Sequence, residues 1–436
     1  MKKVLLFSMM IMLITLVPVQ TAQARFIPTH FMVLRIGLAE RFSARASIDL
    51  RNTAIFYGHN YLQSTSGGFT VRPYGSHQAA LYDGSLRVRV LDASTQVRDA
   101  YGGFIWLEGI AYRGAVEFIR TGGHSITAVN ILSIEEYLFS VVPSEMPASW
   151  HIEALKAQSV AARTYALHAL ERGSTHVGFD LCDRVHCQVY RGVEWEHENS
   201  TQAVLATAGL AAYFAGELID AVYFASSGGF TENSENVWLE ARPYLRSMPD
   251  PHEFEPVIWT RAFSLVELTS LLAQNNHHIG SATGMTIGST HPSGRVESLV
   301  IHGATGQVVL TREEIRTFFS PSPDGSLHSR NFVIGGGHIM PSANVSIFDG
   351  LQTFEVLPHG LYGVDSQRTP MIMGDFSIFG TNAHQPVTAS GDTIMLSGSG
   401  FGHGVGMSQR GAEGMARRGY TFREILAHFY TGITIE

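Results

Sequence analysis

The segment from Val141 to Leu167, VVPSEMPASWHIEALKAQSVAARTYAL, constrains the fold more than any other part of this 436-residue chain. Its alanine-rich second half predicts a helix that begins near His151 and ends before Gly173, a residue type favoured just after helix ends. In front of that helix, two prolines restrict the backbone and predict a tight turn. The turn would hold one carboxylate, Glu145.

Apolar neighbours in sequence can exclude water from the carboxyl group of Glu145; they are Val141, Val142, Met146 and Trp150. A carboxyl group that is kept dry has its charged form disfavoured, so its pKa rises toward neutrality. Such a group suits general acid catalysis at a glycosidic bond. An acid near a helix N-terminus also stabilises the helix dipole, and the local sequence leaves this structural alternative open.

The N-terminus predicts export. A pair of lysines precedes the apolar run Val4–Val19, and Ala22-Gln23-Ala24 has the form of a signal peptidase site. The apolar run is shorter than the roughly 20 residues that a membrane-spanning helix needs. We therefore expect residues 1–24 to be a signal peptide and the mature chain to be extracytoplasmic. An uncleaved N-terminal membrane anchor is the alternative.

Charge and motifs exclude several classes of function. The chain has 30 basic and 38 acidic residues, a net charge of −8 and no basic block, so we expect no nucleic-acid partner. Its 20 histidines are scattered and form no HExxH motif of a zinc peptidase. Ser226 and Ser227 precede a pair of glycines, but no G-x-S-x-G motif of a serine hydrolase surrounds them.

The chain's two cysteines, Cys182 and Cys187, follow His176 in the segment HVGFDLCDRVHC. In an exported protein two cysteines first suggest a disulfide. Two thiolates and an imidazole also suit Zn²⁺, with a fourth position left open. His186 is the weaker candidate ligand, because on an extended segment it would point away from its neighbour Cys187. Zinc and a disulfide both remain open.

The distribution of apolar residues predicts an α+β fold. Alternating and β-branched apolar runs, separated by turn residues, make residues 25–130 a β-rich N-terminal region. Residues 250–395 return to short strands and turns. Beyond the alanine-rich helix, short helices are expected at Ser200–Ala208, Leu265–Gln274, Arg312–Phe319, Gly406–Arg417 and Thr421–Tyr430.

Four segments of the chain resemble the SpoIID/LytB family of stage II sporulation protein D-like and amidase enhancer-like proteins. In chain order they are EEYLFSVVPSEMPASWHIEALKAQSVAARTYAL, DLCDRVHCQVYRG, YFASSGGFTENSENVW and GSGFGHGVGMSQRGAEGMARRGYTFREILAHFYTGITI. The resemblance implies a mixed catalytic domain, begun by residues 131–249, interrupted by a β-rich second lobe at 250–395 and completed by 396–436. A groove between two lobes would suit a long polymer. Residues 335–393 exceed the family's usual connection and receive no predicted role.

The resemblance implies a lytic transglycosylase that acts on peptidoglycan in the cell wall. Such an enzyme cleaves the bond between N-acetylmuramic acid (MurNAc) and N-acetylglucosamine (GlcNAc) and leaves 1,6-anhydroMurNAc ends. Glu145 matches the family's catalytic glutamate and would act first as acid and then as base. The expected substrate is a glycan strand stripped of its stem peptides, in sporulation, and the implied partners are a cell-wall amidase or other sporulation proteins. The alternative is a non-catalytic, glycan-binding enhancer of a cell-wall amidase.

Further site residues follow from the matched segments. Some family members bind zinc through residues that match His176, Cys182 and Cys187, where the metal would be structural. If their segment is a strand, Gln188 and Tyr190 share one face of it and could both line the groove. The candidate substrate-binding residues are Gln188, Tyr190, Ser226, Ser227, His403 and Gln409. Ordinary core or loop hydrogen bonds are the structural alternative for each. Arg163 is predicted to be a buried charge with a partner.

Overall fold

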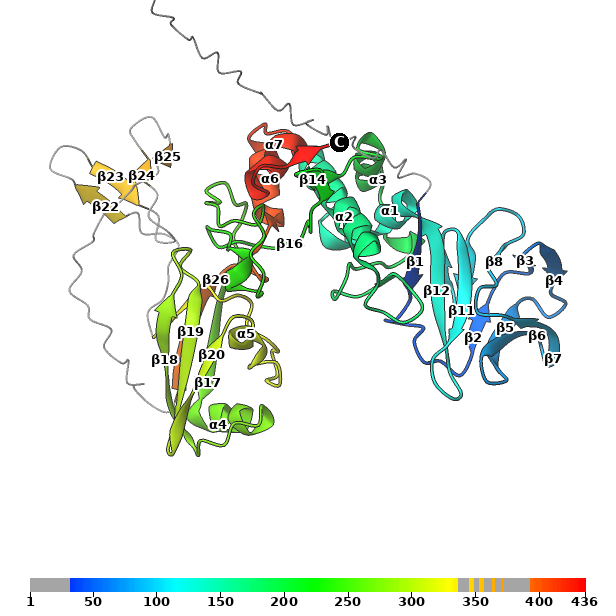
Figure 1. Cartoon of the computed structure of the whole chain (residues 1–436), viewed down its shortest axis with the longest axis horizontal. Helices are drawn as coiled ribbons and strands as arrows, with labels where there is room; N and C mark the ends of the chain where they lie inside the picture. The colour runs from blue at the N-terminus through cyan, green and yellow to red at the C-terminus, as the bar shows by residue number, and fades with distance from the viewer. Residues whose placement is uncertain (1–31, 336–344, 349–352, 357–362, 365–369, 372–392) are drawn as a thin grey trace, which may run out of the picture.

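The structure of the chain is a computed structural model (Figure 1). It describes residues 32–335, 345–348, 353–356, 363–364, 370–371 and 393–436. The predicted signal peptide and most of the segment 335–393 lie outside the described residues. Among the residues that are described, no helix is long and apolar enough to cross a membrane. Helices and several sheets confirm the predicted α+β class.

Two sheets form the N-terminal region. The larger has the order β13-β1-β12-β11-β8-β3-β4 and the smaller the order β10-β9-β2-β5-β6-β7. Strands of the larger sheet are β1 Val33–Gly37, β3 Ala54–Tyr57, β4 Asn60–Gln63, β8 Val97–Asp99, β11 Ala115–Arg120, β12 Ile126–Ser133 and β13 Leu181–Cys182. Strands of the smaller sheet are β2 Ile48–Leu50, β5 Phe69–Tyr74, β6 Gln78–Asp83, β7 Leu86–Leu91, β9 Ile105–Leu107 and β10 Ile110–Tyr112. The parallel pairing of β13 with β1 anchors the cysteine segment at the edge of the larger sheet.

The predicted turn around Glu145 is wrong, because a helix occupies that segment. Helix α1 spans Ile134–Glu145, begins with a capping box from Ser133 and includes Pro143. An interior proline costs a helix about 3 kcal/mol. Burying a large apolar side chain contributes about 1.5–3 kcal/mol, and five in this helix are fully buried: Ile134, Tyr137, Leu138, Val141 and Val142. Burial therefore outweighs the proline, and Glu145 becomes the last residue of a helix.

The alanine-rich helix is confirmed as α2, Ile152–Arg172, followed by Gly173 in a left-handed conformation with φ +79°. It is the central helix of the domain and packs against α1, α3 (Glu198–Ala206), α6 (Gln409–Arg417) and α7 (Phe422–Phe429). Its alanines lie in that core without exposed surface, as Ala154, Ala157, Ala161 and Ala162. Small side chains on α2 thus let four helices approach one helix.

Arg163 on α2 is a buried charge with a partner, as predicted. Its side chain is fully buried and donates to both carboxylate oxygens of Glu135, at 2.9 and 2.6 Å. The remaining nitrogen, Nη1, donates to the main-chain carbonyl of Leu210, and Nη2 also donates to that of Val204. The guanidinium therefore joins α1, α2 and the segment after α3.

The last forty residues return to the domain that residues 33–245 begin. Strand β27 (Met407–Ser408) pairs in parallel with β16 (Tyr223–Phe224), and β28 (Thr434–Ile435) pairs with β14 (Ala212–Phe214), whose other neighbour is β15 (Glu217–Leu218). Val405, Met407 and Phe429 belong to the same hydrophobic core as Leu155 of α2. This return places a glycine-rich loop beside Tyr223.

A second core belongs to the inserted lobe. One sheet has the order β17-β26-β21, with β17 Ile258–Ser264, β26 Thr393–Ser399 and β21 Phe332–Ile334. Another contains β18 Ala282–Thr290, β19 Val296–Gly303 and β20 Gly306–Thr311. Helix α4, Leu265–Gln274, has the predicted bounds, and α5, Glu314–Thr317, lies within its prediction. A small outer sheet consists of β22 Val345–Phe348, β23 Thr353–Val356, β24 Gly363–Val364 and β25 Pro370–Met371.

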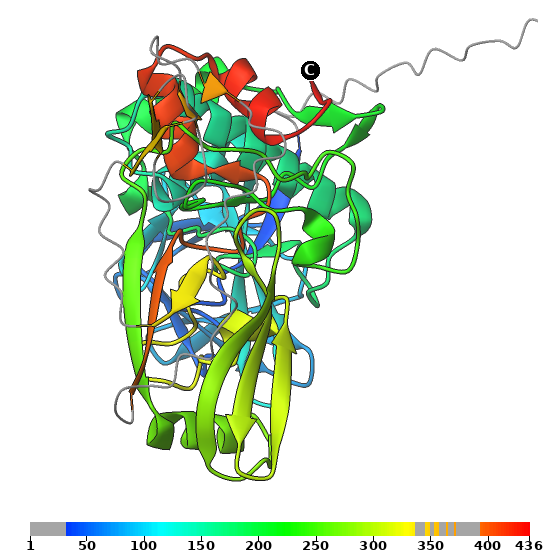
Figure 2. The same cartoon turned by 90° about the vertical axis from the view of Figure 1, so that its left-hand side faces the viewer.

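The arrangement is an arch. In Figure 1 the helices α2, α6 and α7 form its top, the N-terminal sheets lie below them on one side, and the strands β17 to β20 lie below them on the other. Figure 2, turned by 90°, shows the inserted lobe in front of the N-terminal sheets and below the C-terminal helices. The end of α1, the start of α6 and the inserted lobe meet under the top of this arch.

Candidate active site

Glu145 is half-buried at the C-terminal end of α1. Its Oε1 accepts a hydrogen bond from the main-chain N–H of Val189 at 2.7 Å. Burial raises the pKa of this carboxyl group; the Val189 hydrogen bond and the charge of Arg191 oppose that shift without cancelling it. No donor among the described residues reaches Oε2. The group is therefore held at one oxygen, left free at the other and biased toward its protonated form.

A cavity of about 450 Å³ opens beside Glu145, and we name it the central cavity. Residues from both lobes line it, including Arg316 of the inserted lobe and His403 and Gln409 from the C-terminal return. The other lining residues are Tyr165, Val185, His186, Cys187, Val222, Tyr223, Phe224, Ala225, Trp238, Phe401 and Gly402. The sequence predicted that the first and last matched segments would meet, and here they do.

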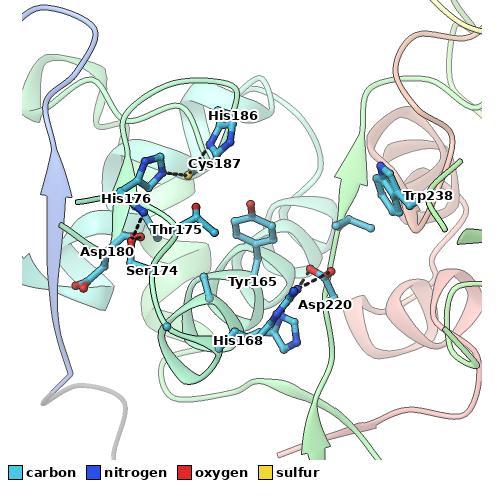
Figure 3. Close-up of a pocket in the computed structure, with 15 residues that line it drawn as sticks. Tyr165, His168, Ser174, Thr175, His176, Asp180, His186, Cys187, Asp220 and Trp238 are labelled. Carbon is cyan, nitrogen blue, oxygen red and sulfur yellow. Dashed lines mark hydrogen bonds and ion pairs between the residues drawn. The ribbon is translucent and has the colours of Figure 1, made fainter. Parts of the chain in front are cut away.

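Two adjoining cavities extend the central one. A cavity of about 420 Å³ shares Tyr165, His186, Cys187, Val222 and Trp238 with it, and Figure 3 shows these walls. On the other side, a cavity of about 330 Å³ shares Val185. The three cavities thus lie next to one another and share wall residues.

Aromatic rings form one edge of the central cavity. Trp238 is 36% exposed and Phe401 44% exposed, and the ring centroids of Trp238 and Phe224 lie 5.0 and 5.5 Å from that of His403. Exposed rings of this kind pack against the apolar faces of sugars. Trp238, Phe401 and Arg316 were not predicted as site residues, although Trp238 and Phe401 stand inside matched segments.

His403 is held neutral in its loop. Its Nδ1 accepts the main-chain N–H of Val405 at 3.1 Å. Burial, followed by the charges of Arg316 and Arg295, lowers the pKa of His403 to about 3. A substituent at Gly404 would meet the Arg295 guanidinium at 2.6 Å, so only glycine lets the loop pass there. The neutral imidazole also hydrogen-bonds the main chain of Tyr223, and it makes no hydrogen bond to Glu145 among the described contacts.

Gln409 also lines the central cavity, at the first residue of α6. Its side-chain amide lies 3.4 Å from the amide oxygen of Gln158. The prediction thus places His403 and Gln409 correctly beside Glu145, while their contact with a substrate stays a prediction.

Gln188 and Tyr190 do not line the central cavity, although Tyr190 lines the adjoining cavity of about 330 Å³. The segment that contains them is not a strand, and both side chains are buried. Gln188 donates to the carbonyl of Ala162 and to the Tyr223 hydroxyl, and Tyr190 donates to Asn130. The shared strand face predicted for them is wrong, because the chain continues through the core after the cysteines. Both residues support the wall that holds Val189.

Ser226 and Ser227 likewise lie outside the central cavity. Both are buried, and their hydroxyl groups donate to Glu253 at 2.6 Å and to Asp250 at 2.8 Å. The glycines that follow them bring the backbone close to protein rather than to a ligand, because a substituent at Gly228 would meet Ser399. The predicted substrate contact is therefore replaced by a structural role.

Four side chains gather into a cysteine–histidine cluster: His176, Cys182, His186 and Cys187. Their candidate ligand atoms all lie within 4.8 Å of one another. His176 Nε2 and His186 Nδ1 are 3.2 and 3.3 Å from Cys187 Sγ, and His186 Nδ1 is 3.8 Å from Cys182 Sγ. Bonds of about 2.0 Å to nitrogen and 2.3 Å to sulfur would place tetrahedral zinc ligands about 3.5 Å apart.

The cluster therefore fits a closed Cys2His2 zinc site. Both cysteines are free thiols in this structure. His186 belongs to the cluster, so the expectation that it would point away from Cys187 is wrong. The segment is a turn, closed by the Cys187 N–H donating to the Arg184 carbonyl, and a turn lets adjacent side chains point the same way. Figure 3 shows three members of the cluster, His176, His186 and Cys187, on the side of Tyr165 away from Trp238.

Comparisons with known proteins agree on a family. Residues 122–214 match the SpoIID family, described as stage II sporulation protein, and residues 253–348 match a family described as Domain of unknown function (DUF8618). An uncharacterized protein of Brachyspira hyodysenteriae is 31% identical over 332 residues, which cover 76% of this chain and 73% of that protein.

Two relatives from Bacillus subtilis carry functional names. The amidase enhancer is 31% identical over 81% of this chain but only 47% of its own length, so this chain spans about half of that protein. Stage II sporulation protein D is 29% identical over 74% of this chain and 78% of its own length. Together with the matched segments that build the central cavity, this similarity shows that the chain belongs to the SpoIID family, whose relatives include stage II sporulation protein D and the amidase enhancer.

Proposed function

We propose that the protein is a peptidoglycan lytic transglycosylase whose catalytic residue is Glu145. One observation supports this proposal above the others: Glu145 has a raised pKa and is the only carboxylate among the described residues that line the central cavity. Hydrolytic glycosidases generally use two carboxyl groups. A lytic transglycosylase needs one, because a hydroxyl group of the substrate is the nucleophile.

Carboxylates in the adjoining cavities have structural partners. Asp180 and Asp183 accept main-chain N–H groups of Arg35 and Glu40 at 2.8 and 2.9 Å. Asp220 lies 3.7 Å from His168, and the Glu40 side chain pairs with Arg184 at 3.1 Å. Burial raises the pKa of Asp183 to about 6 as well, but Asp183 lines the adjoining cavity, and only Glu145 of these described carboxylates lines the central cavity.

Glu145 would transfer one proton in each of two steps. Protonated Glu145 donates to the oxygen that bridges MurNAc C1 and GlcNAc, and the C1–O bond breaks. The resulting carboxylate then takes the proton of the MurNAc C6 hydroxyl, and O6 bonds to C1 to close the 1,6-anhydro ring. Water is not consumed, and Glu145 returns to its protonated form. A carboxyl group with an ordinary pKa would be mostly ionised at neutral pH, so the raised pKa supports the first step.

The cysteine–histidine cluster would hold a zinc ion in a structural role. Zinc there would crosslink the turn that leads to Val189, whose N–H positions Glu145. Four protein ligands leave no open position for a reacting group. The cluster would thereby act on the reaction through the position of Glu145.

We further propose that the substrate is the peptide-stripped glycan strand, and that a cell-wall amidase or another sporulation protein acts alongside. The names of the relatives support this setting. The protein would then be extracytoplasmic, with residues 1–24 as signal peptide and a membrane anchor as the alternative; N-terminal sequencing of the exported protein separates the two. Intact and amidase-treated peptidoglycan, digested side by side, test substrate choice, and equal rates would contradict the preference.

A non-catalytic enhancer is the second candidate, and similarity to the amidase enhancer over 81% of the chain favours it. Product analysis separates the two candidates. Purified protein is incubated with amidase-treated glycan strands, and the fragments are identified by mass spectrometry. A transglycosylase yields 1,6-anhydroMurNAc ends, one water lighter than the reducing ends left by a hydrolase. Binding to the strands without any new ends would support the enhancer.

A further inference from the structure

Arg316 brings a positive charge from the inserted lobe into the central cavity that Glu145 lines. It lies on α5, within the segment that matches a domain of unknown function. Its Nε donates to the Leu327 carbonyl at 3.0 Å, and its Nη1 donates to Glu313 at 2.7 Å. Within the described part of the chain, Nη2 has no hydrogen-bond partner. Two contacts thus fix the guanidinium and leave one donor edge available at the cavity.

The ion pair with Glu313 does not neutralise this corner of the cavity. Two further guanidinium groups, Arg295 and Arg330, lie behind Arg316 and are almost fully buried. Glu313 is also the partner of Arg330, at 3.8 Å, so Arg316 and Arg330 share one carboxylate, while Glu232 and Glu253 act on Arg295. In the described chain, Arg295 Nε and Nη1 have no hydrogen-bond partner, and neither do Arg330 Nε and Nη2.

The guanidinium charges also lower the pKa of the neighbouring imidazole of His403. After burial, Arg316 and Arg295 are the largest causes that lower the pKa of His403. His403 therefore stays neutral at physiological pH and adds no charge of its own. The cavity presents a proton donor at Glu145 and a cationic corner at Arg316, so it suits a substrate that carries an anion beside the bond to be broken.

Peptide-stripped glycan carries one such anion per disaccharide. MurNAc has a lactyl group on O3, and that group is a free carboxylate once the stem peptide is removed. While the peptide is attached, the same carbon belongs to a neutral amide. Arginine is well suited to carboxylates, because its planar fork can make two parallel charge-assisted hydrogen bonds.

We propose that Arg316 binds the free lactyl carboxylate of a MurNAc unit in the central cavity and so selects strands from which the peptide has been removed. The inference rests on the proposed function, because it takes the glycan strand as substrate. The inserted lobe would then supply the residue that distinguishes a free lactyl carboxylate from one that is joined to a stem peptide.

The test compares two peptide-free substrates that differ in charge. Glycan oligosaccharides with free lactyl carboxylates are compared with the same oligosaccharides after conversion of these groups to methylamides. Binding is measured with the Glu145→Gln variant to avoid turnover, and cleavage is measured with the active protein. Because hydrogen bonds between charged groups are among the strong ones, wild-type Arg316 should prefer the free carboxylate by about 10-fold or more in both measurements.

Arg316→Gln should remove the preference, so that affinity and cleavage for the free carboxylate fall by about 10-fold relative to those for the methylamide, measured in the same variant. Arg316→Lys keeps the charge without the fork and should retain part of the preference. Arg312→Gln is the matched control, since Arg312 is exposed on the preceding turn and does not line the cavity. Thermal melts check that each variant is folded.

Failure of this inference differs from failure of the proposed function. If the wild type cleaves both oligosaccharides equally, or if Arg316→Gln keeps the preference, Arg316 does not read the carboxylate although the transglycosylase stands. If no oligosaccharide is cleaved but the charge preference in binding disappears with Arg316→Gln, the enzyme assignment fails and the recognition of the lactyl group stands.

Discussion

The main-chain N–H of Val189 donates to Oε1 of Glu145 at 2.7 Å, and Val189 follows the last residue of the cysteine–histidine cluster by only two positions. The segment that could hold a metal is thus the segment that orients the carboxyl group. The cluster and the candidate catalytic residue form one mechanical unit, in which a displacement of the turn would move the hydrogen bond that fixes Glu145.

Glu145→Gln should abolish the formation of anhydro ends, with a rate loss of roughly 10²-fold or more, because general acid–base catalysis contributes that much. The amide keeps the shape and the Val189 hydrogen bond but cannot transfer a proton. Rates are measured on purified glycan strands, with binding to the strands as the control for folding. A wild-type rate in this variant would remove Glu145 from the mechanism.

The same substitution makes a prediction about stability. Burial raises the folded-state pKa of Glu145 above its unfolded value, so the stability that protonation provides is present at acid pH and is lost as pH rises through the folded pKa. Glutamine has no such dependence. Denaturant titrations at several pH values should show the Gln variant gaining stability relative to the wild type as pH increases. A difference that does not change with pH would contradict a raised pKa.

Activity should fall as pH rises through the pKa of Glu145, because the first step needs the protonated acid. Arg191 lowers that pKa by its charge, so Arg191→Gln should shift the alkaline limb of the kcat/KM profile to higher pH. Arg172→Gln removes a charge from the far end of α2, is 61% exposed, and serves as control. A limb that stays in place in Arg191→Gln would assign it to another group.

Removal of metal should loosen the turn that leads to Val189. We expect about one zinc per chain by elemental analysis, and chelation or Cys182→Ser should lower the melting temperature by several degrees, since 1 kcal/mol corresponds to roughly 2–4 °C in domains of 150–250 residues. His186→Ala should have the same effect, while His124→Ala, at an exposed position, should have none. A stoichiometric Cys182–Cys187 disulfide without metal would replace this interpretation.

The buried pair of Arg163 and Glu135 should be more important to stability than any surface pair. Glu135→Gln leaves a buried guanidinium without its counter-charge, which costs about 3–5 kcal/mol. Glu108→Gln, which breaks an exposed pair with Arg45, should cost less than about 1 kcal/mol. Urea unfolding of both variants decides this, and similar losses would show that the buried pair has no special role.

Helices were predictable from the sequence where local signals agree with packing. Ala-rich α2 ends at Gly173, and α4 starts at Ser264 with a capping box, so both appear with the expected bounds. Helix α1 was missed because Pro143 has a strong local preference against helix interiors, which the burial of distant partners overrides. Part of the candidate site was predictable as well, because the matched segments indicated that Glu145, His403 and Gln409 lie close together.

Other site residues depended on contacts that no local pattern contains. His186 joins the cluster through a turn that was read as an extended segment, and Gln188 turns inward to bind Ala162 and Tyr223. Arg316 reaches the cavity from a lobe with its own hydrophobic core. Its position follows from how two separately packed units meet, which spacing along the chain does not specify.

Strand β27 completes its pairing with β16 only after residues 407 and 408 have been made, and α6 then covers α2. Glu145 is synthesised long before His403 and Gln409, the two residues that complete its cavity. A nascent chain on the ribosome therefore carries the carboxyl group of Glu145 without the rest of its cavity. Assembly in this order would delay the proposed transglycosylase activity until the C-terminal return has folded into place.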